Sequence, residues 1–174
     1  MKTPLEFINA IGVQCQIACK DTHIFPSVCI AQAALETGWG KSAIGNNIFG
    51  IKANTAWKGK KQVIKTTEIL HAQGLEHLFS HVYSVTPQGT GTWLYVVDDW
   101  FRDYDTIADS IKDHNLFLKV NTRYAKAGVF TSKTPEEQIQ HIVEGGYATG
   151  AGYANIIISI IHGYGLKKFD NATV

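Results

Sequence analysis

The sequence lacks the features that would place the chain in a membrane or on a nucleic acid. Its longest aliphatic stretch, residues 156–161 with one serine inside, is far shorter than the ~20 apolar residues that span a bilayer. Sixteen Lys and Arg balance fifteen Asp and Glu, so there is no basic surplus to neutralise phosphates. The sequence therefore predicts no membrane span and no nucleic-acid partner, and an uncharged or mixed-charge ligand fits better.

Cysteine is scarce, and the first residues do not resemble a cleavable leader. The three cysteines, Cys15, Cys19 and Cys29, are an odd number, and each lies in an apolar helical pattern. We expect buried reduced thiols rather than a disulfide framework. The N-terminal MKTPLE has neither the apolar stretch nor the small-residue cleavage site of a signal peptide, so we expect no export by general secretion.

Helical patterns dominate the two ends of the chain. With 174 residues, 45% of them hydrophobic, a single domain spanning residues 1–174 is expected. A capping box at residues 3–6 predicts a first helix, and further helices are expected from Pro26 to Glu36, after Asp105, after Thr134 and over residues 153–164. The second helix is apolar on nearly every side and the last is rich in isoleucine, so both are expected to be largely buried.

The middle of the chain has a different pattern. Between Gln62 and Phe101, three stretches rich in β-branched and aromatic residues, 63–69, 78–85 and 93–97, are separated by turn-forming segments. They predict an antiparallel sheet of about three strands. The expected fold is therefore α+β, mainly α, with a small β lobe at roughly residues 60–101 inserted in a helical body.

Glu36 is the most informative single position. It closes the apolar helix and is followed directly by Thr37-Gly38-Trp39-Gly40. An acid in this setting is partly desolvated, which raises the pKa of a carboxyl group and lets it hold a proton near neutral pH. A glutamate that merely ended the helix would meet the unfavourable end of the helix dipole. We therefore interpret Glu36 as a general acid that is supported by Trp39.

Five motifs occur in order along the chain. Residues 31–42 are AQAALETGWGKS, residues 47–52 are NIFGIK, and FRDYD, RY and GYAT follow at 101–105, 123–124 and 146–149. Together they resemble the AQAALESGWGKS, NLFGIK, FRAYDS, RYA and GYATDPxYA motifs of the flagellar-rod and autolysin N-acetylglucosaminidases, glycoside hydrolase family 73. The resemblance covers roughly residues 4–168, and an ordered series of motifs is far more specific than any one of them.

The resemblance implies a lysozyme-like helical fold with a β lobe, and peptidoglycan, with its β-1,4-linked GlcNAc and MurNAc, as the substrate. Glu36 matches the general acid of the family, and Glu68 matches the acidic residue often proposed as a second catalytic carboxylate. Tyr147 matches an aromatic residue of the cleft near the acid, which makes it the third catalytic candidate. The candidate substrate-binding residues are Trp39, Asn47, Phe49, Tyr124 and Tyr153.

The chain departs from the family pattern in two places. After Thr149 it has Gly150-Ala151-Gly152 where the family has an aspartate and a proline, which would alter the shape of that loop. The stretch from His77 to Trp100 is longer than in typical members and would reshape the substrate groove or its lid.

Several alternatives stay open at this point. Muramidases and lytic transglycosylases also use a lone glutamate in this fold, and a non-catalytic wall-binding module would keep the fold for recognition. Glu68 could complete an inverting or a retaining pair, or the 2-acetamido group of the substrate could attack while Tyr147 orients it. His71, His77 and His81 accompany no strict ligand motif, so we expect neither a metal site nor a cofactor.

The expected setting is the bacterial cell wall, with the chain acting as a monomer. The missing leader and the free cysteines suggest a phage or prophage lysin that is delivered through a holin, or a tail-associated enzyme. The alternative is a catalytic fragment of a longer secreted autolysin.

Overall fold

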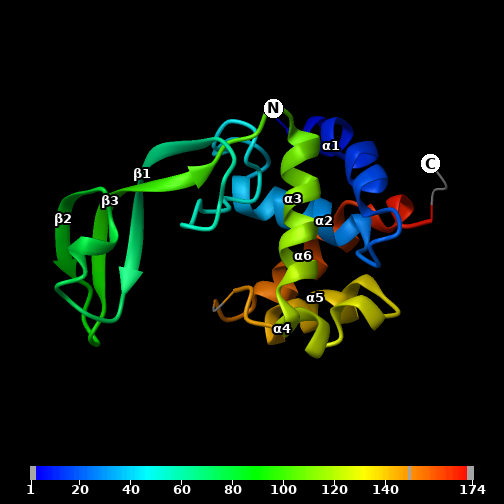
Figure 1. The fold of residues 1–174 in the computed structure, drawn as a ribbon. Helices are drawn as coiled ribbons and strands as arrows, with labels where there is room; N and C mark the ends of the chain where they lie inside the picture. Colours follow the sequence, from blue (N-terminus) through cyan, green and yellow to red (C-terminus); the bar gives the residue numbers. More distant parts are fainter. Residues whose placement is uncertain (1–2, 149, 172–174) are drawn as a thin grey trace. The chain divides into compact units, whose positions relative to one another are not determined.

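The computed structural model describes residues 3–148 and 150–171. The chain divides into two compact units, one made of Met1–Phe49 with Tyr104–Val174 and the other of Gly50–Asp103. The first unit is helical and the second is built on a three-stranded antiparallel sheet (Figure 1). The predicted α+β class, mainly helical with an inserted antiparallel sheet, is confirmed. No described helix has both the length and the apolar character that a membrane crossing requires.

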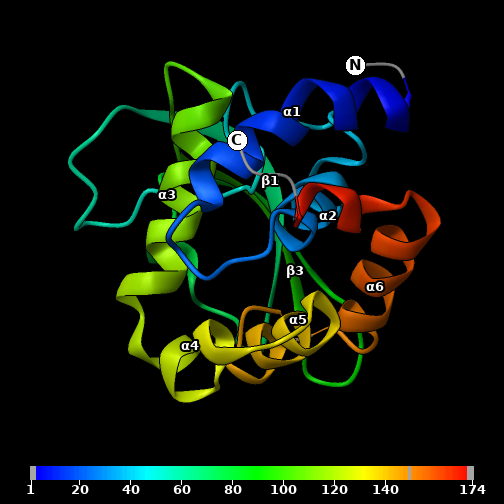
Figure 2. The same cartoon turned by 90° about the vertical axis from the view of Figure 1, so that its right-hand side faces the viewer.

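The first unit is organised around one central helix. Its described α-helices are α1 (Pro4–Cys19), α2 (Pro26–Thr37), α3 (Ile107–Val120), α4 (Thr122–Lys126), α5 (Pro135–Glu144) and α6 (Tyr153–Gly163). Two short 3-10 segments complete them, η2 (Val129–Thr131) and η3 (Leu166–Phe169). α2 packs against α1, α5, α6 and η3, and α3 packs against α1 and α4 (Figure 2).

Burial of α2 explains why the unit has this centre. Every residue from Ser27 to Ala34 is buried, as the apolar sequence predicts, and each fully buried Val or Ile side chain contributes about 1.5–3 kcal/mol. The N-cap residue, Phe25, offers no side-chain cap. Asp170, after η3, takes that place: its carboxylate accepts hydrogen bonds from the Ser27 backbone N–H and hydroxyl, both at 2.8 Å.

The helix starts largely follow the sequence. The Thr3 hydroxyl accepts from the Glu6 N–H at 3.2 Å and the Glu6 carboxylate accepts from the Thr3 N–H at 3.1 Å, so the predicted capping box is confirmed. The start of α3 lies one residue later than predicted. Thr106 rather than Asp105 is the N-cap, because its hydroxyl accepts from the Asp109 N–H at 3.2 Å.

The prediction for the last helix is partly wrong. α6 buries Ile157 and Ile161 fully, but Ile156 is 47% exposed. The helix is therefore amphipathic, with one isoleucine-lined face against α2 and α5. The isoleucines of a helix are all buried only when neighbouring elements cover the helix on every side. α6 is covered on the side of Ile157 and Ile161, whereas Ile156 stays exposed.

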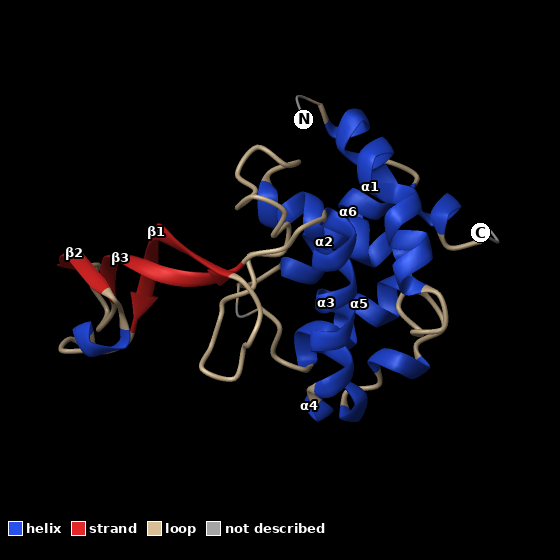
Figure 3. Cartoon of the chain, turned by 45° about the horizontal axis from the view of Figure 1, so that its top comes forward, coloured by secondary structure: helices blue, strands red, loops and turns tan. Residues whose placement is uncertain are grey.

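The second unit contains β1 (Lys61–Leu70), η1 (Glu76–Leu78), β2 (His81–Pro87) and β3 (Trp93–Arg102) (Figure 3). The strand order is β1-β3-β2, and β1 pairs with β3 from Lys61 opposite Arg102 to Leu70 opposite Trp93. The second strand begins at His81 rather than at Leu78, which lies in η1. His77 therefore lies outside the strand that begins at His81. Among the described residues, no group of three or more His, Cys, Asp or Glu side chains could hold a metal ion.

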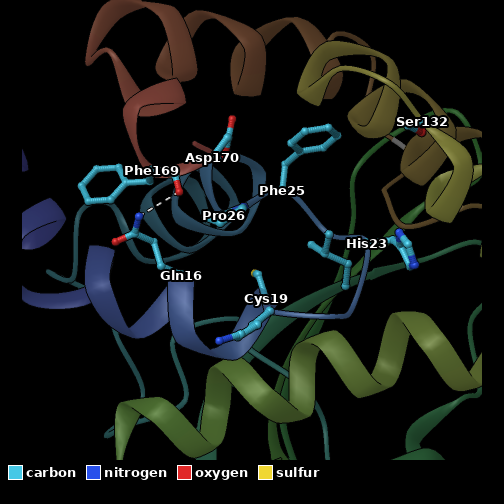
Figure 4. A pocket seen from close by; sticks show the side chains of 10 residues that line it. Gln16, Cys19, His23, Phe25, Pro26, Ser132, Phe169 and Asp170 are labelled. Atoms are coloured by element: carbon cyan, nitrogen blue, oxygen red, sulfur yellow. Dashed lines mark hydrogen bonds between the residues drawn. The ribbon is translucent and has the colours of Figure 1, made fainter. Parts of the chain in front are cut away.

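A pocket of about 400 Å³ lies in the first unit near the end of α1. Gln16 lines the pocket, and its Nε2 donates to the backbone carbonyl of Phe169 at 2.9 Å (Figure 4). Cys19 lines it, and all three cysteines are buried free thiols, as predicted. The lining residues do not include Glu36 or its neighbours, so this pocket is separate from the predicted acid.

Gly145, at the end of α5, tests how tightly the first unit is packed. A Cβ at this position would lie 2.5 Å from Cδ1 of the fully buried Tyr124 ring. We expect Gly145→Ala to lower the free energy of unfolding by about 1–3 kcal/mol, as overpacking does. Gly163→Ala in α6 is the control, because its Cβ would meet nothing within 4 Å. Urea unfolding followed by circular dichroism measures both, and equal stability of the two variants would contradict the packing described here.

Candidate active site

The turn after α2 fixes the end of the helix that carries Glu36. Gly38, Trp39 and Gly40 all have positive φ angles, 54°, 64° and 81°. Such a conformation is unusual for tryptophan and is strained without surrounding support. Thr37 provides part of that support, since its hydroxyl donates to the Ala33 carbonyl at 2.6 Å and accepts from the Gly40 N–H at 2.8 Å. The helix therefore ends at a defined point directly after Glu36.

Glu36 lies where the buried helix meets solvent. Its side chain is exposed, so a substrate could reach it. The protein groups crowded around its carboxyl nevertheless withdraw it partly from water, and this burial raises the pKa of Glu36 above its ordinary value. The hydroxyl of Tyr153 donates to Glu36 Oε1 at 3.1 Å and opposes the shift. The net result is a carboxyl group that is more readily protonated than a free glutamate.

Tyr153 is held at the first turn of α6 by contacts to α2. Its hydroxyl accepts a hydrogen bond from Gln32 Nε2 at 3.3 Å while it donates to Glu36. Gln32 and Glu36 are four residues apart on α2, so they lie on the same helix face. Burial, with the nearby Glu36 charge, raises the pKa of Tyr153 far above its ordinary value, and the hydroxyl stays protonated as a donor.

Tyr147 lies at the centre of an aromatic cluster. It follows Gly146, and its backbone N–H donates to the Ile142 carbonyl at 3.2 Å. Burial raises the pKa of Tyr147 well above its ordinary value, so its hydroxyl is also a permanent donor. The rings whose centroids lie 5.8–6.5 Å from that of Tyr147 are His114, Phe117, Tyr124 and Tyr153. The ring of Tyr147 thus lies next to that of Tyr153, which donates the hydrogen bond to Glu36.

His114 is a fully buried histidine within this cluster. It stacks on Phe49 with ring centroids 3.9 Å apart. Asn115 donates through Nδ2 to the Ala18 carbonyl at 3.0 Å, so its Oδ1 accepts from His114 Nδ1 at 3.3 Å. Burial lowers the pKa of His114 to about 4. The histidine is therefore neutral at physiological pH, with Nε2 as a lone-pair acceptor.

Three of the predicted substrate-binding residues lie in the interior. Asn47 is 1% exposed, Phe49 5% and Tyr124 0%. Phe49 packs against His114, and Tyr124 accepts a hydrogen bond from Arg123 Nη2 at 2.8 Å. Phe49 and Tyr124 thus support the cluster around Tyr147, and the contact of all three residues with a substrate stays a prediction.

Trp39 is half-buried in the turn after α2. Its ring packs edge-on against Phe7, with centroids 6.2 Å apart, and at 4.5 Å from the ring of Tyr164. These contacts attach the turn to α1 and to the segment after α6. Trp39 thereby anchors the turn that ends the helix of Glu36, and its support of the acid stays a prediction.

Glu68 belongs to the second unit, on β1. Its carboxylate pairs with Lys52 Nζ at 2.7 Å, and Lys52 also pairs with Asp99 on β3 at 2.9 Å. Burial alone would lower the pKa of Lys52, but the two carboxylates outweigh it and raise the pKa above its ordinary value. Lys52 thus holds two carboxylates side by side on one face of the sheet.

Sequence reasoning missed three residues that the structure brings into prominence: Gln32, His114 and Lys52. Gln32 and Lys52 lie inside the motifs at residues 31–42 and 47–52, whereas His114 lies outside the five motifs. Polar residues in an apolar helical pattern were the available signal for Gln32 and His114. Thr149 lies outside the described residues, and the altered loop that follows it ends at Gly152, the N-cap of α6.

The arrangement in the first unit suits acid catalysis. One exposed carboxyl has a raised pKa, and two tyrosine hydroxyls that stay protonated lie beside it or one ring away. A carboxyl group of this kind can deliver a proton to a leaving oxygen. Protonated hydroxyls can then donate to a carbonyl or to developing negative charge.

Comparison with known proteins identifies the chain. Residues 13–166 match the family model described as "Mannosyl-glycoprotein endo-beta-N-acetylglucosaminidase". The chain belongs to this glucosaminidase family. This membership confirms the resemblance to glycoside hydrolase family 73 that was drawn from the motifs.

Relatives and a solved structure agree with this assignment. The chain is 32% identical over 165 residues to the peptidoglycan hydrolase FlgJ of Vibrio parahaemolyticus, covering 91% of this chain and 46% of FlgJ. It is 28% identical to the exo-glucosaminidase LytG of Bacillus subtilis, and the match covers 94% of this chain and 52% of LytG. The chain thus spans about half the length of these curated relatives.

The fold comparison confirms the predicted lysozyme-like class. The catalytic domain of the autolysin Auto from Listeria monocytogenes superposes on this glucosaminidase with a TM-score of 0.74 at 28% identity. The match covers 98% of this chain and 89% of the Auto domain. The greater length of residues 77–100 relative to typical members stays a prediction.

The buried neutral His114 makes a testable contribution to acid stability. In the unfolded chain its pKa is the ordinary 6.5, whereas in the folded protein it is about 4. Between these values the unfolded state binds a proton that the folded state does not, so stability falls as the pH falls through this window, by roughly 3 kcal/mol in all. We expect His114→Phe, which can keep the stacking on Phe49, to flatten this dependence by about one proton.

Urea titrations at intervals between pH 7 and pH 4 measure the effect as the difference between wild type and variant. Other acids contribute equally to both proteins and cancel. An identical slope in the two proteins would show that His114 is not the group responsible.

Proposed function

We propose that this glucosaminidase hydrolyses the β-1,4 bond between GlcNAc and MurNAc within the glycan strands of bacterial peptidoglycan, with Glu36 as the general acid. The observation that carries the proposal is the exposed Glu36 carboxyl at the end of the buried α2, with its raised pKa and its hydrogen bond from Tyr153. Family membership supports the glucosaminidase chemistry, and the relative FlgJ is itself a peptidoglycan hydrolase.

In the proposed reaction the Glu36 carboxyl donates its proton to the glycosidic oxygen as the C1–O bond breaks. The sugar then carries positive charge at C1, which a second group must relieve before water completes the hydrolysis. Our proposal for that group is Glu68. The alternative is the substrate's own 2-acetamido group, whose amide the Tyr147 hydroxyl would orient.

Trp39 and Tyr153 complete the proposed substrate contacts, with Asn47, Phe49 and Tyr124 shaping the cluster behind them. The proposed enzyme needs no metal and no cofactor, because both proton donation and charge relief come from side chains or substrate. We propose that it acts as a monomer, which light scattering in solution would test. The predicted settings, a phage lysin or part of a secreted autolysin, stay predictions.

The role of Glu36 is tested by Glu36→Gln, which keeps the shape but removes the transferable proton. We expect kcat on peptidoglycan to fall by a factor of about 10²–10⁴, the usual weight of general acid catalysis. Glu144→Gln is the matched control, since Glu144 is an exposed carboxylate at the end of α5. It should retain wild-type activity. Wall lysis by Glu36→Gln at the wild-type rate would overturn the assignment and favour a non-catalytic wall-binding role.

The bond that the wild-type enzyme cuts is identified from the products of a peptidoglycan digestion. Products are reduced with borohydride and analysed by mass spectrometry, and glucosaminitol ends are expected. Muramitol ends would identify a muramidase, and anhydro-muramic ends a lytic transglycosylase. The family model describes an endo-acting enzyme whereas LytG is an exo-glucosaminidase. Early appearance of long glycan fragments distinguishes the endo mode from release of single units from strand ends.

Glu68 and Asp99 share Lys52, so they form a matched pair for testing the second carboxylate. We expect Glu68→Gln to lower kcat by about 100-fold or more if its carboxylate acts on the sugar. Asp99→Asn removes the other half of the same ion-pair cluster and should cost far less. Equal losses would assign the effect to disruption of the cluster. Near-normal activity of Glu68→Gln would favour attack by the acetamido group.

A further inference from the structure

The side-chain amide of Gln32 is buried and makes few hydrogen bonds. Gln32 is 0% exposed, and its one hydrogen bond within the described residues runs from Nε2 to the Tyr153 hydroxyl at 3.3 Å. Its other polar atom, Oε1, is buried without a hydrogen-bond partner among those residues. Buried polar groups are nearly always paired, so an unpaired one calls for a physical explanation.

Gln138 of α5 shows what a structural glutamine looks like in the same unit. It is also 0% exposed, but its amide makes three hydrogen bonds. Oε1 accepts from the Phe25 N–H at 2.8 Å, and Nε2 donates to the carbonyls of His23 and Val129 at 2.7 and 2.9 Å. Gln138 thereby ties three backbone groups together. Gln32 ties down only the hydroxyl of Tyr153.

The bond from Gln32 decides where the Tyr153 proton points. A hydroxyl has one hydrogen to donate and lone pairs to accept with. When the Gln32 N–H occupies a lone pair of Tyr153, the tyrosine hydrogen is directed at Glu36 Oε1, which is its acceptor at 3.1 Å. Oε1 is then an acceptor, and a proton on Glu36 belongs on Oε2, the oxygen that Tyr153 does not engage.

We propose that Gln32 is a positioning residue for the acid: it orients the Tyr153 hydroxyl, and through it keeps the proton of Glu36 on Oε2 for delivery to the substrate. This inference rests on the proposed role of Glu36. It also explains the unpaired Oε1, because a buried amide with one bond adds little to stability and is retained for what that bond does.

The charged and titratable groups around the hydrogen bonds that join Gln32, Tyr153 and Glu36 come from three helices and one turn. Glu36 lies on α2 and Tyr153 on α6, while Tyr147 follows α5 and Tyr124 lies on α4. The pKa values of Tyr153 and Tyr147 are raised by burial and by the Glu36 charge, so both stay protonated when Glu36 titrates. A change in the titration of Glu36 on substitution of Gln32 therefore reports on the Gln32–Tyr153 bond.

The test compares Gln32→Met, which keeps the length of the side chain without its amide, with Gln138→Met. For Gln32→Met we expect a melting temperature equal to or above that of wild type and a kcat about tenfold lower, the weight of one hydrogen bond. We also expect a higher pKa for Glu36, because Tyr153 no longer holds the ionised form as firmly. Gln138→Met should lose stability without moving that pKa. Gln32→Leu replaces the Met variant if the latter does not fold.

The pKa of Glu36 is read directly by carbon NMR of the labelled carboxyl, without substrate, so this readout is independent of activity. Tyr153→Phe should raise the pKa further, and adding Gln32→Met to it should change nothing more, because Gln32 acts through Tyr153. An unchanged pKa in Gln32→Met, or a loss of stability with no change in pKa, would overturn the inference. If Glu36→Gln were active while the pKa shifts appeared as described, the proposed function would fail and the hydrogen-bond relay would stand.

Discussion

The burial of α2 is the constraint on which the candidate site depends. A helix whose residues from Ser27 to Ala34 are all enclosed cannot rotate or slide without exposing apolar surface. Its last turn therefore has one orientation, and Glu36 emerges at a fixed point between buried helix and solvent. The three left-handed residues after Thr37 stop the helix there. The raised pKa of Glu36 follows from that position, because the same neighbours that enclose the helix also crowd its last carboxyl.

Much of this could be predicted from the sequence because the decisive signals are local. The capping box at Thr3 and the apolar run after Pro26 specify helices from neighbouring residues alone, and the position of Glu36 directly follows. The predicted helix boundaries were less accurate where two neighbouring residues could each serve as the N-cap. Asp105 and Thr106 are both good N-cap residues, and only the folded backbone shows that the Thr106 hydroxyl reaches the Asp109 N–H.

The non-local contacts could not be derived in the same way. Nothing near Gln32 in the sequence indicates that a tyrosine 121 residues later will accept its single hydrogen bond. The interior position of Tyr124 was also not predicted, because an aromatic residue in a motif is equally consistent with stacking on a sugar and with packing in the interior. Lys52 illustrates the same limit in the second unit, where a strand pairing brings its two carboxylate partners together.

The hydrogen bonds from Ser27 to Asp170 join positions 143 residues apart, so the start of the helix that carries the acid is completed by a residue that is made long after the helix itself. During synthesis on the ribosome, α2 emerges well before Asp170 and lacks its cap until Asp170 has left the exit tunnel. Contacts of such long sequence separation form late, because the intervening chain must first be ordered. α2 therefore lacks this cap while the 143 residues that separate Ser27 from Asp170 are being synthesised.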